Sequence, residues 1–108
     1  MSNSKSTIWE SRIALQLAEA LVAIDNSQDM QNFLRDVMTE KEITEISSRF
    51  EAARMLQSGS KYTDIVARTK LSSRTIARIS GWLRDGCSGY EAALNAVHHD
   101  HVSPARAD

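Results

Sequence analysis

Apolar residues recur every three or four positions along most of this 108-residue chain, and few segments show the alternation of strands. The pattern predicts an all-α protein of six helices with short connections. Its single proline, Pro104, lies near the end and would interrupt none of them. The predicted helices cover residues 8–24, 28–38, 40–57, 61–69, 74–86 and 90–97. We expect one helical domain over residues 1–97, followed by a flexible tail over residues 98–108.

Local signals mark the ends of several predicted helices. Thr39 and Glu42 have the spacing of a capping box, in which each side chain accepts a hydrogen bond from a free backbone amide. Gly59 follows the third helix, where glycine tolerates a left-handed conformation. Ser88 and Glu91 repeat the capping-box spacing before the last helix.

The first predicted helix has a broader apolar stripe than the single buried face of an amphipathic helix needs. Its stripe contains Ile8, Trp9, Ile13, Leu15, Leu17, Leu21, Val22 and Ile24. A domain of this size offers little surface to cover so broad a stripe. We interpret the segment as a dimerisation helix, with packing inside the same chain as the alternative.

Charge is strongly segregated, although the formal net charge is only −1. Between Arg54 and Arg84 the chain has seven basic residues and one acid, Asp64, which gives +6. The remaining residues have six basic and 13 acidic groups, which gives −7. A basic segment of this kind is typical of proteins that bind a polyanion.

Residues 61–84, which include IVARTKLSSRTIARI, have the pattern of a helix-turn-helix. On a helical wheel, Ile76, Ile79 and Leu83 share one face, while Arg74 and Arg78 lie nearly opposite, beside the small residues Ala77 and Gly81. Arginine can reach guanine edges or phosphates, and small neighbours allow a close approach to DNA. We predict a second helix that lies in the major groove.

The expected DNA contacts fall into two groups. Side chains at the start of the first helix, near amides that can hold phosphate, are Lys61, Tyr62 and Thr63. Those at the start of the second helix are Ser72, Ser73, Arg74, Thr75, Ala77 and Arg78. Two positions depart from the usual motif, since Lys70 occupies the turn position often filled by glycine and Val66 replaces a small residue. A purely structural helical hairpin, or a protein-interaction module whose basic face meets an acidic partner, are the alternatives.

The segment from Thr39 to Tyr90 resembles the Trp-repressor-like superfamily, and particularly its YerC/YecD-like branch. The resemblance rests on MTEKEITEISSRFEAARMLQSGSKYTDIVARTKLSSRTIARI and WLRDGCSGYEAAL. It implies a six-helix Trp-repressor-like fold, an intertwined homodimer and two helix-turn-helix units that read a palindromic DNA operator. Half-sites would then lie about one helical turn, ~34 Å, apart. It also implies a bacterial transcriptional regulator, which we expect to act as a repressor.

The resemblance also identifies where a tryptophan corepressor would bind. The two arginines that enclose the indole ring in tryptophan-responsive members match Arg49 and Arg78. The glycine that leaves room for the ring is replaced by Ile79, and a serine that holds the ligand is replaced by Trp82. Isoleucine would occupy the ring's volume, so we expect repression that does not depend on tryptophan. A regulator that responds to tryptophan or another small molecule is the alternative.

Other sites are poorly supported by the sequence. His98, His99 and His101 do not share a helical face, so we expect a solvated tail and no metal or cofactor. Cys87 has no neighbouring base, and no catalytic motif is present, so we expect no enzyme. The lone cysteine suggests a reducing cytoplasm. The chain has neither a signal-peptide pattern nor an apolar run of the ~20 residues that span a membrane. We therefore expect a cytoplasmic protein, at the nucleoid when bound to DNA.

Overall fold

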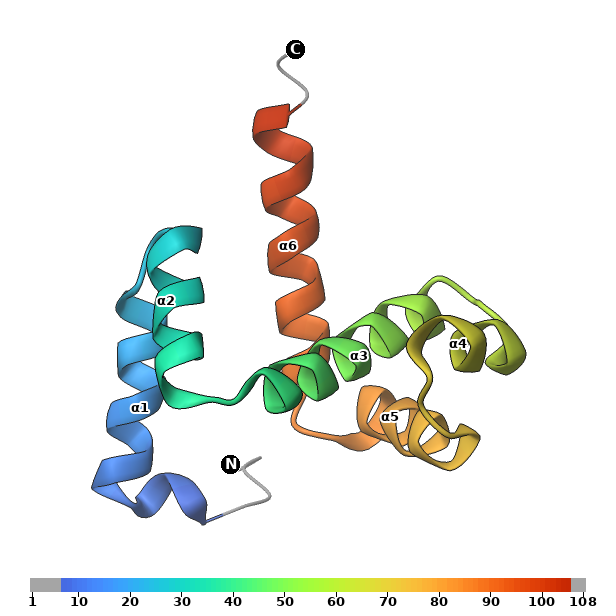
Figure 1. The fold of residues 1–108 in the computed structure, drawn as a ribbon, viewed down its shortest axis with the longest axis horizontal. Coiled ribbons are helices and arrows are strands. Elements are labelled where there is room, and N and C mark those ends of the chain that lie inside the picture. Colours follow the sequence, from blue (N-terminus) through green and yellow to red (C-terminus); the bar gives the residue numbers. More distant parts are fainter. Residues whose placement is uncertain (1–6, 106–108) are drawn as a thin grey trace. The chain divides into compact units, whose positions relative to one another are not determined.

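A computed structural model of the protein describes the backbone of residues 7–105 and the side chains of residues 7–97. The regular elements in this range are a 3-10 turn and six α-helices, which confirms the all-α prediction (Figure 1). They form two compact units that divide between Ile46 and Ser47, inside the helix α3 (Glu40–Gln57). That one domain covers residues 1–97 stays a prediction.

The first predicted helix is interrupted at Ser11. A 3-10 turn, η1 (Ile8–Glu10), precedes Ser11, and α1 (Arg12–Ala23) follows it. Ser11 has an extended backbone, and its Oγ accepts a hydrogen bond from the amide of Ala14 at 3.2 Å. A serine hydroxyl that satisfies an unpaired amide favours a helix start over a helix interior. One continuous helix over residues 8–24 was therefore wrong at its first turn.

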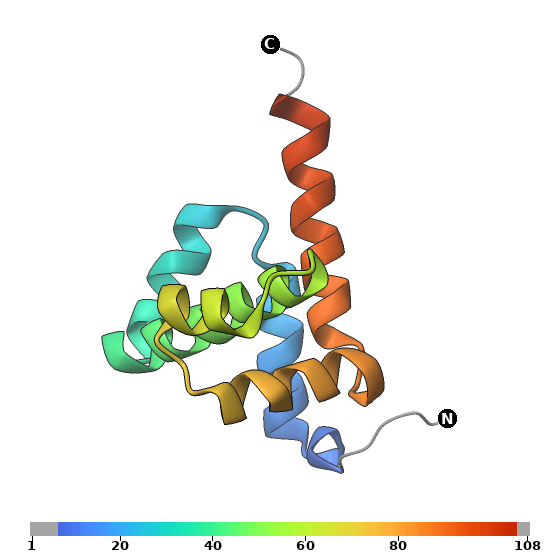
Figure 2. The same cartoon turned by 90° about the vertical axis from the view of Figure 1, so that its right-hand side faces the viewer.

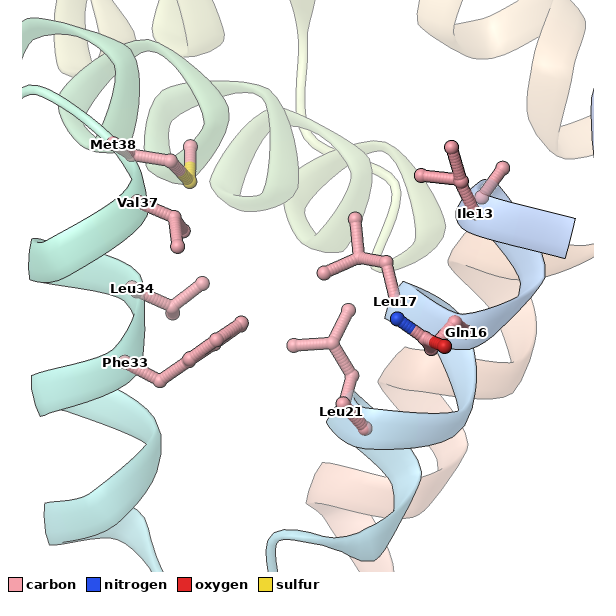
Figure 3. Close-up of a pocket in the computed structure, with 10 residues that line it drawn as sticks. Ile13, Gln16, Leu17, Leu21, Phe33, Leu34, Val37 and Met38 are labelled. Carbon is pink, nitrogen blue, oxygen red and sulfur yellow. The ribbon is translucent and has the colours of Figure 1, made fainter.

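The N-terminal unit leaves an open apolar groove between α1 and α2 (Ser27–Val37). Side chains of α2 point across the groove toward Leu17 and Leu21 of α1 (Figure 3). The cavity has a volume of about 690 Å³ and is lined almost entirely by apolar side chains. Ile13 is 81% exposed and Val37 54% exposed. This unit thus does not bury its own apolar surface, which agrees with the excess predicted for its first helix.

Both ends of α3 follow the predicted signals. The Thr39 amide donates to Glu42 Oε1 at 2.9 Å, and the Glu42 amide donates to Thr39 Oγ1 at 3.1 Å, so the capping box is formed. At the other end Gly59 has a φ of 86°, a left-handed conformation that is strained for other residues. The amide of Ser60 donates to the carbonyl of Met55 at 2.9 Å, which completes the helix end.

The C-terminal unit contains the buried core. Its members come from α3, α4 (Tyr62–Thr69), α5 (Ser73–Asp85) and α6 (Gly89–Ala105), and they are Ala52, Ala53, Met55, Ile65, Ile76, Ile79 and Leu94. Two alanines in the C-terminal half of α3 belong to the same buried cluster as the isoleucines of the two short helices. In both views α4 and α5 lie side by side, and α6 begins near the end of α5 and extends away (Figure 1 and Figure 2). The core therefore fixes α4 and α5 as one body on α3.

The last helix is longer than predicted. It begins at Gly89, after Ser88 with a φ of 68°, and it continues to Ala105 instead of ending at residue 97. No glycine or proline occurs from residue 91 to residue 103, so nothing in this stretch terminates the helix. The predicted end of this helix at residue 97 was therefore wrong. That the tail over residues 98–108 is flexible stays a prediction.

An ion-pair network attaches α4 to α3. The carboxylate of Glu51 accepts hydrogen bonds from Arg54 Nε at 2.8 Å and Arg54 Nη2 at 2.7 Å, on the same helix. It also accepts one from Arg68 Nε, in the last turn of α4, at 2.6 Å. The hydrogen bonds from Arg54, followed by that from Arg68, lower the pKa of Glu51 from 4.5 to about 2, although partial burial opposes them. The folded protein thus holds this carboxylate in its charged form.

Glu51→Gln should reveal how acid weakens the network. Because the pKa is lowered in the folded state, the ion pairs contribute fully above pH 4.5 and are lost as the pH falls toward 2. We expect the variant to lower the free energy of unfolding by only about 1 kcal/mol near neutral pH, since both arginines are over half exposed. Urea titrations at several pH values measure the difference between variant and wild type.

The matched control for this prediction is Glu40→Gln, on the same helix. Its carboxylate is 83% exposed and lies 3.8 Å from Arg35, so its removal should change the free energy of unfolding by less than about 0.5 kcal/mol. A wild-type advantage over Glu51→Gln that stayed constant from neutral pH down to pH 2 would contradict the assignment.

Candidate nucleic-acid interface

The turn between α4 and α5 is closed by local hydrogen bonds. Lys70 has a φ of 65°, so the helix ends in a left-handed residue at the position where the motif often has glycine. Its amide donates to the carbonyl of Val66 at 2.8 Å. Buried Thr69 donates through Oγ1 to the carbonyl of Ile65 at 2.7 Å and accepts from the amide of Leu71 at 3.2 Å. These bonds hold the chain in a fixed path from one helix to the next.

Ser72 begins the second helix of the motif. Its Oγ accepts a hydrogen bond from the amide of Thr75 and donates one to Thr75 Oγ1, both at 3.1 Å. Ser72 is therefore the N-terminal cap residue of α5. Ser73 is the first residue of α5, and its side chain is exposed.

The orientation of α5 agrees with the helical wheel. Ile76 and Ile79 are fully buried against α3 and α4, whereas Arg74, Ala77 and Arg78 are exposed. Burial of the isoleucines thus turns the arginines outward. Within residues 7–97, neither Arg74 nor Arg78 is held by an ion pair. Their guanidinium groups are therefore available to an external anion.

The start of α4 presents a second polar surface. Lys61 is the N-terminal cap residue of the helix, has an extended backbone and offers no side-chain cap to the free amides. Lys61 and Thr63 are exposed, and Tyr62 is 41% exposed. Free amides at a helix N-terminus attract anions, and a neighbouring lysine adds to the attraction. Thr75, on α5, is half-buried and is the least accessible of the predicted contacts.

The residues that match a tryptophan pocket have different environments. Ile79 is completely buried in the core cluster, so its side chain occupies space in the folded chain. Trp82 is 43% exposed in the single chain. Arg49 is half-buried on α3, and its charge lowers the pKa of Tyr90, although burial has the larger effect and raises that pKa overall. Arg78 is exposed on α5.

Two features near this surface were not predicted from the sequence, namely the hydrogen bonds of Thr69 and the ion pairs of Glu51. Thr69 closes the turn from a buried position, and its signal was a threonine at the end of an amphipathic helix, where its hydroxyl can bond the carbonyl four residues earlier. The Glu51–Arg54 pair has a local signal, because residues three apart are neighbours on a helix. Arg68 joins that pair from 17 residues away, and local patterns carry no information on such contacts.

Other chemistry has little support in the described part of the chain. No cluster of histidine, cysteine or acidic side chains there could hold a metal ion. The side chains of His98, His99 and His101 lie outside the described residues. Cys87 is an exposed free thiol. Among the helices described here, none has the length and apolar character needed to cross a membrane.

Known proteins share this sequence pattern and fold. The Trp repressor protein family profile matches residues 14–98. A TrpR-like protein from Eubacterium eligens is 30% identical, with a TM-score of 0.80 over 86% of this chain and 96% of its own. A candidate Trp repressor from Staphylococcus aureus is 27% identical, with a TM-score of 0.77 over 88% of this chain and 96% of its own. No curated protein sequence matches significantly.

The family match covers both helices of the motif and most of the remaining chain. The predicted Trp-repressor-like fold is confirmed by the two solved structures. The chain therefore belongs to the Trp repressor family of helix-turn-helix DNA-binding regulators.

Proposed function

We propose that the protein is a homodimeric transcriptional repressor that reads a palindromic operator and does not depend on tryptophan. The observation that carries this proposal is the exposure of Arg74 and Arg78 opposite the buried face of α5. In this arrangement Ser73, Arg74, Ala77 and Arg78 face base edges, with Ser72 and Thr75 at the start of the helix. Lys61, Tyr62 and Thr63 hold the DNA backbone. The protein acts on chromosomal DNA in the bacterial cytoplasm.

The apolar groove of the N-terminal unit supports a dimer. Ile13, Leu17 and Val37 remain about half exposed or more, and they contribute to one continuous apolar surface (Figure 3). Exposed apolar surface of this extent is typical of an interface. We propose that a second copy of the chain covers it, because the two-fold symmetry of a dimer suits a palindromic operator.

Burial of Ile79 supports independence from tryptophan. The resemblance to tryptophan-responsive members implies a glycine at this position, which leaves space for the indole ring, and here a fully buried isoleucine takes that volume. Inserting further bulk into a packed site costs roughly 1–3 kcal/mol before any ligand contact is gained. With Trp82 in place of the ligand-holding serine, these departures also favour the YerC/YecD-like branch.

Arg74→Ala and Lys61→Ala should have different effects on DNA binding. An operator is first selected from a random duplex pool with the wild-type protein. Loss of a base contact in Arg74→Ala should weaken operator binding by about 1–3 kcal/mol and reduce sequence preference. Loss of a phosphate contact in Lys61→Ala should weaken all duplexes about equally and reduce the salt slope by about 1. Titrations of operator and scrambled duplexes at several salt concentrations measure both effects.

Equal effects of these two variants on every duplex would contradict groove reading by α5. A wild-type protein that binds no duplex even at low salt would instead favour a role in which the basic face meets an acidic protein.

Leu17→Glu should dissociate the dimer. A carboxylate in the apolar groove would have to be buried without a partner, so the associated state should lose several kcal/mol. Sedimentation equilibrium should show a monomer at concentrations at which the wild type is a dimer. Gln28→Glu is the matched control, because Gln28 is an exposed polar residue of α2 that does not line the groove. A wild-type protein that remains monomeric would contradict the proposal.

Titration with L-tryptophan should give no saturable heat for the wild type. Ile79→Gly would open the volume beside Arg78, so this variant is the one in which weak binding should first be detected by calorimetry. Ile76→Gly creates a similar loss of bulk at another fully buried position and serves as the control for non-specific cavity binding. Micromolar binding by the wild type would contradict independence from tryptophan.

A further inference from the structure

Glu51 forms ion pairs with two arginines that lie outside α5, the helix proposed to read the bases. Its two carboxylate oxygens accept three hydrogen bonds, two from Arg54 and one from Arg68. Arg54 lies one turn further along α3, while Arg68 lies in the last turn of α4. One half-buried carboxylate thus pairs with two of the seven basic residues between Arg54 and Arg84, and its single negative charge leaves these three side chains with a net charge of +1.

Both arginines would be effective cations without this carboxylate. Their side chains are 53% and 65% exposed, so neither is shielded by burial. They belong to the same compact unit as the helix-turn-helix, and Arg68 is part of α4 itself. Exposed cations attract the phosphates of any duplex, and this attraction carries no sequence information. Loss of the negative charge of Glu51 would therefore strengthen binding to arbitrary DNA more than binding to one operator.

The network also restrains the first helix of the motif. Only two residues of α4, Ile65 and Thr69, are buried, so this short helix has a small apolar attachment. Arg68 adds a charged attachment to α3 near the turn, at the opposite end of α4 from Lys61. A helix held at its C-terminal end presents its N-terminal amides in a defined direction. The carboxylate of Glu51 therefore both lowers the positive charge beside α4 and restrains that helix.

We propose that Glu51 is a specificity-determining residue of the DNA-binding surface, which restricts Arg54 and Arg68 and so limits binding to DNA of arbitrary sequence. This inference rests on the proposed DNA-binding function. Glu51 itself is acidic and has no direct role in holding DNA. It acts through the two arginines.

The test compares wild type and Glu51→Gln on the selected operator and on scrambled duplexes. We expect the variant to bind scrambled duplexes about three- to tenfold more tightly, with a salt slope that is steeper by up to about 0.9, because the net charge of these three side chains rises by one. The ratio of operator affinity to scrambled affinity should fall at least threefold. Glu40→Gln, which changes the net charge equally on the same helix, should leave this ratio and the salt slope unchanged.

A rescue experiment separates released charge from structural damage. The double variant Glu51→Gln, Arg68→Gln has the wild-type net charge, because it removes one negative and one positive charge, so its affinity for scrambled duplexes and its salt slope should return to the wild-type values. If Glu51→Gln is not folded by circular dichroism, Glu51→Asp replaces it. The shorter carboxylate cannot reach both arginines, and its affinity ratio should lie below that of the wild type.

The outcomes distinguish this inference from the proposed function. Equal weakening of operator and scrambled binding by Glu51→Gln, or an unchanged ratio, would overturn the inference while the protein remained an operator-binding regulator. A wild-type protein that selects no preferred sequence would overturn the proposed function. In that case a rise in affinity for random duplexes in Glu51→Gln would still support restriction of the two arginines.

Discussion

The rest of the structure depends on one buried cluster. In it, Ile65, Ile76 and Ile79 are gathered with Ala52 and Ala53 of α3. All three isoleucines are fully buried. Their burial fixes the rotation of α4 and α5 about their own axes, because a helix that buries one face must expose the other. The direction of the arginines is thus decided by the core, and no polar interaction of Arg74 or Arg78 is needed to orient them.

The polar interactions of the same unit add precision to this arrangement. Thr69 and Lys70 fix the turn between the helices, Ser72 fixes the start of α5, and Glu51 attaches the end of α4. Each of these bonds contributes on the order of 1 kcal/mol. Their combined effect is geometric, since a surface that reads DNA needs its side chains held in a defined position. The N-terminal unit contributes differently, through apolar surface that it leaves uncovered.

Much of this organisation could be predicted from sequence, because its causes are local. Periodicity located α2 to α5, and the capping box of Thr39 and Glu42 placed the start of α3. The errors also have local causes: Ser11 acted as a cap within a continuous apolar stripe, and α6 continued where the polar histidine segment suggested an end. The contact of Glu51 with Arg68 could not be predicted, because it depends on how two helices pack. The DNA contacts themselves stay predictions.

The left-handed turn at Lys70 bears on how readily this motif could be altered. A lysine in this conformation stores roughly 1 kcal/mol or more that glycine would release, so the hinge between the two helices is not at its thermodynamic optimum. Replacement of Lys70 by glycine would also remove one positive charge from the basic segment between Arg54 and Arg84. Relief of backbone strain and electrostatic attraction are therefore opposed at Lys70, since replacement by glycine would achieve the first and weaken the second.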